Sequence, residues 1–190
     1  MHGLDGQFVV MFAGNIGFIS VLETVLDAAK VLKDRSDIQF LIVGEGNAKA
    51  ALVKKADDFG LPNVRFLPTQ SPKVLPGMLA AADVSLVTLD RRLGQLNVPS
   101  KTYNIMASGR PVLASVPTDS EIARLVKEAT CGVTVPPEDP TALAEAIVQM
   151  KRDPNKLDRL GKNGRRYVEK HYAKDKIILK YRELLHEVAN

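Results

Sequence analysis

The chain has 190 residues, of which 45% are hydrophobic and 25% charged, an ordinary composition for a globular protein. Its one cysteine excludes a disulfide framework, and its three histidines form no motif with cysteines and carboxylates that would indicate a metal site. No apolar run approaches the ~20 residues that a membrane-spanning helix needs, and the net charge is +4.

Strands and helices are expected to alternate along the chain. Short apolar runs predict six strands, at residues 7–14, 37–44, 63–68, 83–89, 110–115 and 131–136. Helical spacing predicts helices at 21–32, 47–60, 72–82, 100–108 and 120–130, and everything from Pro140 onward reads as helical. In the helix at 72–82, Pro76 is expected to introduce a kink.

Continuous apolar strands separated by helices indicate a parallel sheet covered on both faces. Right-handed crossovers then give an α/β, Rossmann-like three-layer domain with a six-stranded parallel sheet. Because no internal repeat or low-complexity linker interrupts the pattern, one domain is expected over residues 1–190.

The C-terminal third is strongly basic. Residues 151–183 contain twelve Lys and Arg against five Asp and Glu. A solvated helical face is the favoured interpretation, and attraction to anionic lipid headgroups stays open. Nucleic acid is not an expected partner, since aromatic residues make up 5% of the chain and tryptophan is absent.

In a parallel α/β sheet, ligands bind at the loops that follow the carboxyl ends of the strands. The first such loop is "AGNIG", with Gly14, Asn15 and Gly17, and the second is "GEGNA", with Gly44 and Gly46. These glycines allow a ligand to approach the backbone, or they form tight turns and nothing more. Neither loop has the spacing of the dinucleotide fingerprint, and no P-loop motif is present.

The segment "GQLNVPSKTYNIMASGRPVLAS" carries the strongest signal. Pro99 is expected to open a helix that Ser100 caps, and the unpaired N–H groups there attract an anion. Lys101 puts a cation where the helix dipole favours an acidic residue. Binding of a phosphate would explain this; the alternative is that the Lys101 side chain simply points into water. Asn104, one turn further, could hydrogen-bond a sugar hydroxyl.

Seven motifs in order give the chain a family resemblance. They are "FAGNIG", "FLIVGEGNAKAAL", "NVRFLP", "LAAADVSLVTL", "VPSKTYNIMASGRPVLAS", "SEIARLV" and "CGVTVPPEDPTALAEAI". Together they resemble the C-terminal, donor-binding half of a GT-B fold retaining glycosyltransferase of the glycosyl transferases group 1 family. The "VPSK" loop is similar to that of the branch containing enzymes of surface-polysaccharide assembly.

The resemblance implies roles for particular residues. In the family, two glutamates with seven residues between them precede the G-x-P-V turn. Here the second position is Asn104, which could hold the ribose with a neutral amide, and the first falls near Leu96, so neither is a carboxylate. The family often has Arg and Lys after the first strand, where this chain has Asn15 and Ser20.

Lys101 is therefore the expected counter-charge for the diphosphate and the expected catalytic group, stabilising the leaving group. The remaining donor-binding positions implied by the resemblance are Leu67, Pro68, Thr69 and Gln70 near the base, Asn97, Val98, Pro99 and Ser100 near the sugar, and Glu121 in "DSEI".

The implied reaction is transfer of a hexosyl group from a nucleotide-diphosphate sugar to an acceptor in polysaccharide or glycolipid assembly, with retention and without a metal or other cofactor. The family has a second, N-terminal domain that holds the acceptor. Its absence from these 190 residues predicts an inactive fragment, with residues 1–6 as a remnant of the interdomain linker. The expected location is cytoplasmic, with a lipid-linked acceptor allowing peripheral association with the inner face of the membrane.

Three alternatives remain at this point. The missing acidic pair fits a nucleotide-sugar binding module without catalysis. A GT-B-like sugar-nucleotide epimerase would need a histidine near the cleft, whereas His2, His171 and His186 all lie towards the termini. Nucleic-acid binding by the basic C-terminal third is the least favoured.

Overall fold

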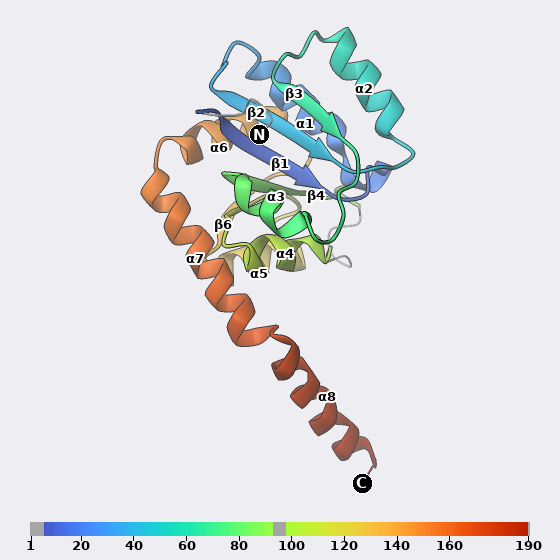
Figure 1. Cartoon of the computed structure of the whole chain (residues 1–190), viewed down its shortest axis with the longest axis vertical. Coiled ribbons are helices and arrows are strands. Elements are labelled where there is room, and N and C mark those ends of the chain that lie inside the picture. Colours follow the sequence, from blue (N-terminus) through green and yellow to red (C-terminus); the bar gives the residue numbers. More distant parts are fainter. Residues whose placement is uncertain (1–5, 93–97, 190) are drawn as a thin grey trace.

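One sheet of six parallel strands forms the centre of the molecule. The computed structural model describes residues 6–92 and 98–189. The strand order in the sheet is β3-β2-β1-β4-β5-β6, and every neighbouring pair is parallel (Figure 1). The strands are β1 (Phe8–Ala13), β2 (Ile38–Val43), β3 (Val64–Leu67), β4 (Val84–Thr88), β5 (Val112–Ser115) and β6 (Gly132–Val135). The predicted six-stranded parallel sheet is thus confirmed.

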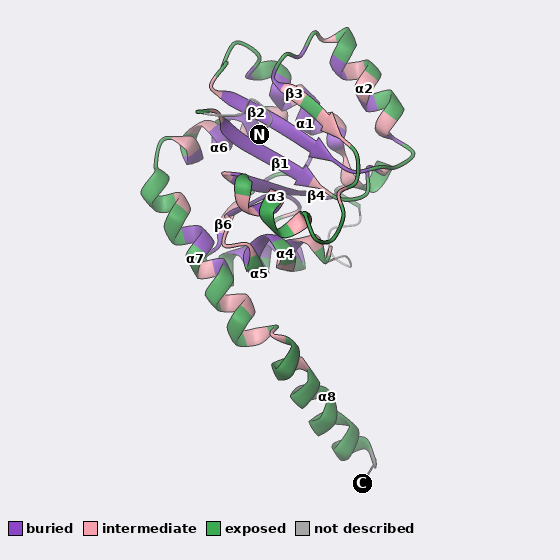
Figure 2. Cartoon of the chain, viewed as in Figure 1, coloured by how far each residue is buried: buried purple, intermediate pink, exposed green. Residues whose placement is uncertain are grey.

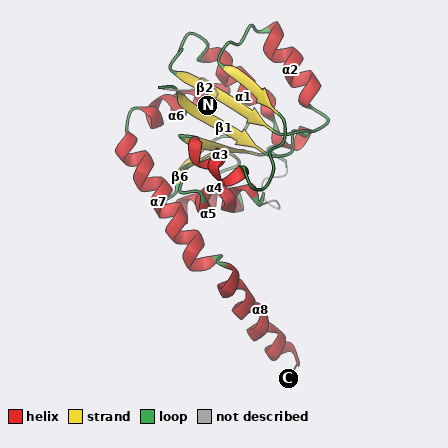
Figure 3. Cartoon of the chain, viewed as in Figure 1, coloured by secondary structure: helices red, strands yellow, loops and turns green. Residues whose placement is uncertain are grey.

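Helices cover both faces of the sheet (Figure 3). They are α1 (Leu22–Val31), α2 (Lys49–Asp58), α3 (Leu75–Ala81), α4 (Lys101–Ala107), α5 (Glu121–Glu128), α6 (Pro140–Lys151), α7 (Pro154–His171) and α8 (Lys174–Ala189). Alternate strand residues enter two separate cores: Val10 and Phe12 pack with α1, α2 and α6, while Val9 and Met11 pack with α3, α4 and α5. This gives the predicted three layers.

Two details differ from the sequence-based expectation. Pro76 does not kink α3, because it lies in the first turn. Backbone N–H groups there have no intrahelical acceptor, so proline costs the helix no hydrogen bond. The helical region after Pro140 is divided into three helices. Asp139 and Asp153 each cap a helix that begins with proline, and the Asp153 side chain accepts a hydrogen bond from Lys156 N at 2.9 Å.

A strained turn joins β1 to α1. After the short 3₁₀ helix η1 (Phe18–Ser20), Val21 adopts left-handed backbone angles, with φ of 41° and ψ of 47°. The loop is fixed to β4, since the Thr88 hydroxyl donates to Ser20 O and Asp90 N donates to Ile19 O at 3.2 Å. A β-branched residue in this conformation is costly, so the hydrogen bonds to β4 hold Val21 in place.

We expect Val21→Gly to raise the free energy of unfolding by about 1 kcal/mol. Glycine removes the steric penalty of the left-handed conformation, and its larger loss of backbone entropy on folding offsets part of this gain. Urea unfolding followed by circular dichroism measures it. Val31→Gly, at an exposed position in the last turn of α1, is the matched control and should lose about 0.5 kcal/mol. If both variants lowered the free energy of unfolding equally, the claim that Val21 is strained would be wrong.

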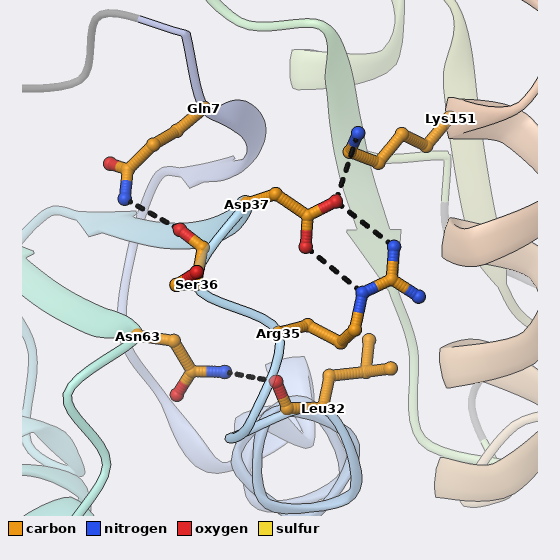
Figure 4. Close-up of polar contacts among 7 residues, drawn as sticks. All are labelled: Gln7, Leu32, Arg35, Ser36, Asp37, Asn63 and Lys151. Carbon is orange, nitrogen blue, oxygen red and sulfur yellow. Dashed lines mark hydrogen bonds and ion pairs between the residues drawn. The ribbon is translucent and has the colours of Figure 1, made fainter.

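Polar contacts join the loops at the amino edge of the sheet, opposite the carboxyl ends of the strands (Figure 4). Asp37 pairs with Arg35 at 2.9 Å and with Lys151 of α6 at 3.0 Å, and the hydrogen bond from Arg35 is the largest cause that lowers the pKa of Asp37. Buried Asn63 donates to Leu32 O at 3.2 Å. These contacts tie the end of α1 to β3 and α6.

The last helix extends away from the body of the molecule, and Figure 2 shows it exposed along most of its length. Its large exposed side chains include Ile178, Leu179, Tyr181, Leu184, Leu185 and Val188. α8 therefore presents an apolar surface that the described part of the chain does not cover. None of the described helices is long and apolar enough to cross a membrane.

Candidate functional site

A cavity of about 430 Å³ opens at the carboxyl ends of the strands. The strand order reverses between β1 and β4, and in open parallel sheets this switch point is where ligands bind. Its walls come from the loops after β1, β2 and β3, from α3, and from the first turns of α4. The two loops and the helix singled out in the sequence thus meet at one place.

The two glycine-rich loops pack directly on each other. Gly14 N donates to Val43 O at 2.9 Å, and Gly44 N donates to Leu67 O at 3.0 Å, so the sheet's hydrogen-bond ladder continues into the loops. A Cβ at Gly44 would lie 1.9 Å from Gly14 O, and one at Gly46 would lie 2.2 Å from Ile16 O. These two glycines are therefore required for loop packing, whatever binds beside them.

Lys101 places a cation in the cavity wall. Its Nζ lies 3.7 Å from the centre of the Phe12 ring and contacts the position that a Gly14 side chain would occupy. Burial lowers the pKa of Lys101 to about 8, and no carboxylate in the described ranges forms an ion pair with it. An unpaired, half-buried ammonium is costly, and an anion bound beside it would relieve that cost.

Ser100 does not cap α4 in the expected way. Its backbone is helical, with φ of −55° and ψ of −25°, and its side chain accepts no hydrogen bond from the first turn. A capping residue needs an extended backbone to aim its oxygen at those N–H groups. Instead Pro99 O accepts from Thr102 N at 3.0 Å, and Ser100 itself lines the cavity beside Lys101.

The structure brings many of the predicted donor-binding residues together. Those that line the cavity are Gly14, Asn15, Gly44, Thr69, Gln70, Ser100, Lys101 and Asn104. Those described outside its lining are Gly17, Gly46, Leu67, Pro68, Val98, Pro99 and Glu121. Asn97 and Leu96 lie outside the described residues.

Two polar positions have local partners rather than a place in the cavity. Glu121, at the start of α5, pairs with Arg124 at 2.6 Å on the exposed surface, so the geometry gives no support to its donor-binding role. Ser20, where the family often has a lysine, donates to Asn15 O at 3.1 Å. The cation of this site therefore comes from α4.

Sequence reasoning missed the deep part of the cavity. Its lining there comes from Leu75, Met78 and Leu79 of α3, Ile105 of α4 and Ser85 of β4. Each lies in an apolar run, which indicates a core position. Only the separation of α3 from α4, a tertiary feature, reveals that these side chains face a cavity.

Among residues 6–92 and 98–189, no group of three His, Cys, Asp or Glu side chains could hold a metal ion. The expectation that donor binding needs no metal stays a prediction.

A family model described as "Glycosyl transferases group 1" matches residues 2–167. The protein named as the colanic acid biosynthesis glycosyl transferase WcaI of Escherichia coli K12 is 33% identical over 178 residues, which cover 93% of this chain and 42% of the relative. The chain thus spans less than half the length of this relative.

Solved structures share the fold at lower identity. Anabaena HepE in complex with UDP matches with a TM-score of 0.85 and 19% identity, over 97% of this chain and 50% of HepE. The C-terminal domain of the group 1 glycosyl transferase LpcC from Francisella tularensis matches with a TM-score of 0.73 and 18% identity, over 89% of this chain and 88% of that domain. The fold is that of the C-terminal half of a GT-B enzyme.

Proposed function

Because this chain belongs to the glycosyl transferases group 1 family, we propose that its cavity binds the nucleotide-diphosphate sugar donor of a hexosyl transfer in polysaccharide or glycolipid assembly. The observation that carries the proposal is Lys101, an unpaired ammonium in the wall of a cavity at the switch point of the sheet. The complex of HepE with UDP is consistent with it.

The chemistry assigned to this half is stabilisation of the leaving group. In the transfer, the bond between the anomeric carbon and the diphosphate oxygen breaks, and a bond to an acceptor oxygen forms while the acceptor hydroxyl loses its proton. Charge grows on the diphosphate, and the Lys101 ammonium beside the loops of Gly14 and Gly44 would neutralise it. Asn104 would hold the ribose, and retention follows from the family resemblance alone.

The remaining machinery is assigned to a second domain. We propose that an N-terminal domain supplies the acceptor site, and that the 190 residues alone bind the donor without transferring it. The exposed apolar side chains of α8 fit such a neighbour. A lipid-linked acceptor would place the complete enzyme at the cytoplasmic face of a membrane.

We expect one nucleoside diphosphate to stabilise the chain against heat. At 100 times its dissociation constant, a ligand adds about 2.7 kcal/mol, which corresponds to roughly 5–10 °C for a chain of this size. Thermal unfolding with UDP, GDP and a non-hydrolysable sugar nucleotide measures the shift and identifies the base. A DNA duplex is the control and should give no shift. Stabilisation by DNA but by none of the nucleotides would refute the proposal.

A second candidate is a nucleotide-sugar binding module without catalysis, which the neutral Asn104 at a family glutamate position favours. Binding does not separate the two functions. Transfer assayed with the chain joined to its N-terminal domain does, since a module without catalysis would bind the donor and release no nucleoside diphosphate.

A further inference from the structure

The cavity has two chemically different ends. At the carboxyl edge of the sheet its lining is polar and includes Gly14, Gly44 and Lys101. From there it continues down the sheet face between α3 and α4, where Leu75, Met78, Leu79 and Ile105 form apolar walls. Ser85 lies three residues before the end of β4, about 10 Å from the carboxyl edge at the rise of a strand.

The Ser85 hydroxyl is buried without a partner. Ser85 is 1% exposed, and its Oγ makes no hydrogen bond. Four buried side-chain atoms in the described ranges share this condition, in Gln7, Asn63, Ser85 and Thr102, and of these residues Ser85 alone lines the cavity. Native proteins rarely leave such a group unsatisfied, so an orphan hydroxyl that faces a cavity indicates a ligand group that pairs with it.

Ser85 reaches this position through the alternation of the strand. Residues 85 and 87 of β4 face the same side of the sheet, and Val87 packs in the core formed with α3, α4 and α5. The backbone of Ser85 is already engaged, since its N–H donates to Pro111 O at 3.1 Å. The side chain is therefore the part available to a ligand, and a hydroxyl can both donate and accept.

We propose that the slot between α3 and α4 takes the nucleobase of the donor, and that Ser85 Oγ hydrogen-bonds the polar edge of that base and so helps to select it. The inference rests on the proposed function. A base has planar apolar faces, which suit the walls of Leu75, Met78 and Ile105, and a polar edge, which suits one buried hydroxyl. A sugar carries hydroxyls around its ring that these apolar walls could not satisfy.

Isothermal titration calorimetry on the 190-residue chain tests the inference with two probes. One is the nucleoside diphosphate, UDP or GDP, that the wild type binds more tightly, and the other is inorganic pyrophosphate, which lacks a base. Ser85→Ala should weaken binding of the nucleotide about five- to tenfold, the usual effect of losing one hydrogen bond. Ser85→Val fills the floor of the slot and should weaken it further, while both variants bind pyrophosphate as the wild type does.

Thr102→Val is the matched control. Thr102 lies in α4, and its buried hydroxyl also lacks a hydrogen-bond partner, but the residue does not line the cavity. Its replacement should leave nucleotide binding unchanged. Unchanged nucleotide affinity in both Ser85 variants would overturn the inference and leave the donor site standing. A parallel loss of pyrophosphate binding would also overturn it, because the effect would then not concern the base. If the wild type binds neither probe, the proposed function fails with it.

Discussion

Replacing Lys101 by methionine is expected to weaken the binding of nucleoside diphosphates about 30-fold or more and, at the same time, to stabilise the ligand-free protein. Removing one partner of a desolvated charge pair costs about 2–5 kcal/mol of binding free energy, and in this cavity Lys101 is the proposed partner of the diphosphate. Methionine keeps the length and the contact with Phe12 but removes the charge.

The gain in stability has a separate cause. Burial lowers the pKa of Lys101 to about 8, so at neutral pH the folded protein keeps an ammonium that is poorly solvated. After allowance for partial solvent screening, its removal should raise the free energy of unfolding by about 1–2 kcal/mol. Calorimetric titration measures the first effect, and urea unfolding without ligand measures the second.

The pH dependence provides the check. Between pH 8 and 10.5 the unfolded chain keeps the Lys101 proton that the folded chain releases, so the Lys101 contribution to stability rises with pH over this window. Affinity for the diphosphate should fall through the same window, because the ammonium is lost. Lys101→Met removes both trends, and Lys101→Arg should keep binding at pH 9. Wild-type affinity in Lys101→Met would show that the cation does not meet the diphosphate.

The sequence predicted the order and type of the elements because the strands are continuous apolar runs and the connections follow handedness rules. It did not predict the strained Val21, since the left-handed turn there depends on hydrogen bonds from Thr88 and Asp90 of another strand end. The amphipathic pattern of the last helix left two interpretations open, exposure of its apolar side or packing on its own domain, because such a pattern does not indicate which surface covers it. The structure leaves α8 exposed.

The candidate site was predictable at its edge and not in its depth. Lys101 was recognisable because a cation at a helix start contradicts the dipole, and the structure places it in the cavity wall. Gly44 and Gly46 admitted two interpretations, and the clash with Gly14 and Ile16 shows why glycine is required there. The sequence did not single out Ser85, because a serine within an apolar strand looks like any other strand residue. Only the structure shows that its buried hydroxyl has no hydrogen-bond partner.

The attachment of α7 depends on glycines that looked unremarkable in a helical region. Gly161 is buried where α7 crosses the turn between α4 and β5, and a Cβ there would lie 2.0 Å from Gly109 O. Gly164, one turn later, faces Cys131, and a Cβ added at Gly164 would lie 3.0 Å from the Cβ of Cys131. The helix can therefore approach the backbone of the turn only where side chains are missing.

Gly161→Ala is accordingly expected to lower the free energy of unfolding by about 2–4 kcal/mol, because backbone atoms on both sides must separate to admit the methyl group. Gly77→Ala is the matched control. Gly77 also lies within a helix, α3, but a Cβ there meets nothing within 4 Å, so alanine should add about 0.5–1 kcal/mol through its helix propensity. Urea unfolding of both variants would show opposite signs. Stabilisation by Gly161→Ala would mean that α7 does not pack on the Gly109 turn. In that case α7 would not support α4, the helix that begins at Lys101.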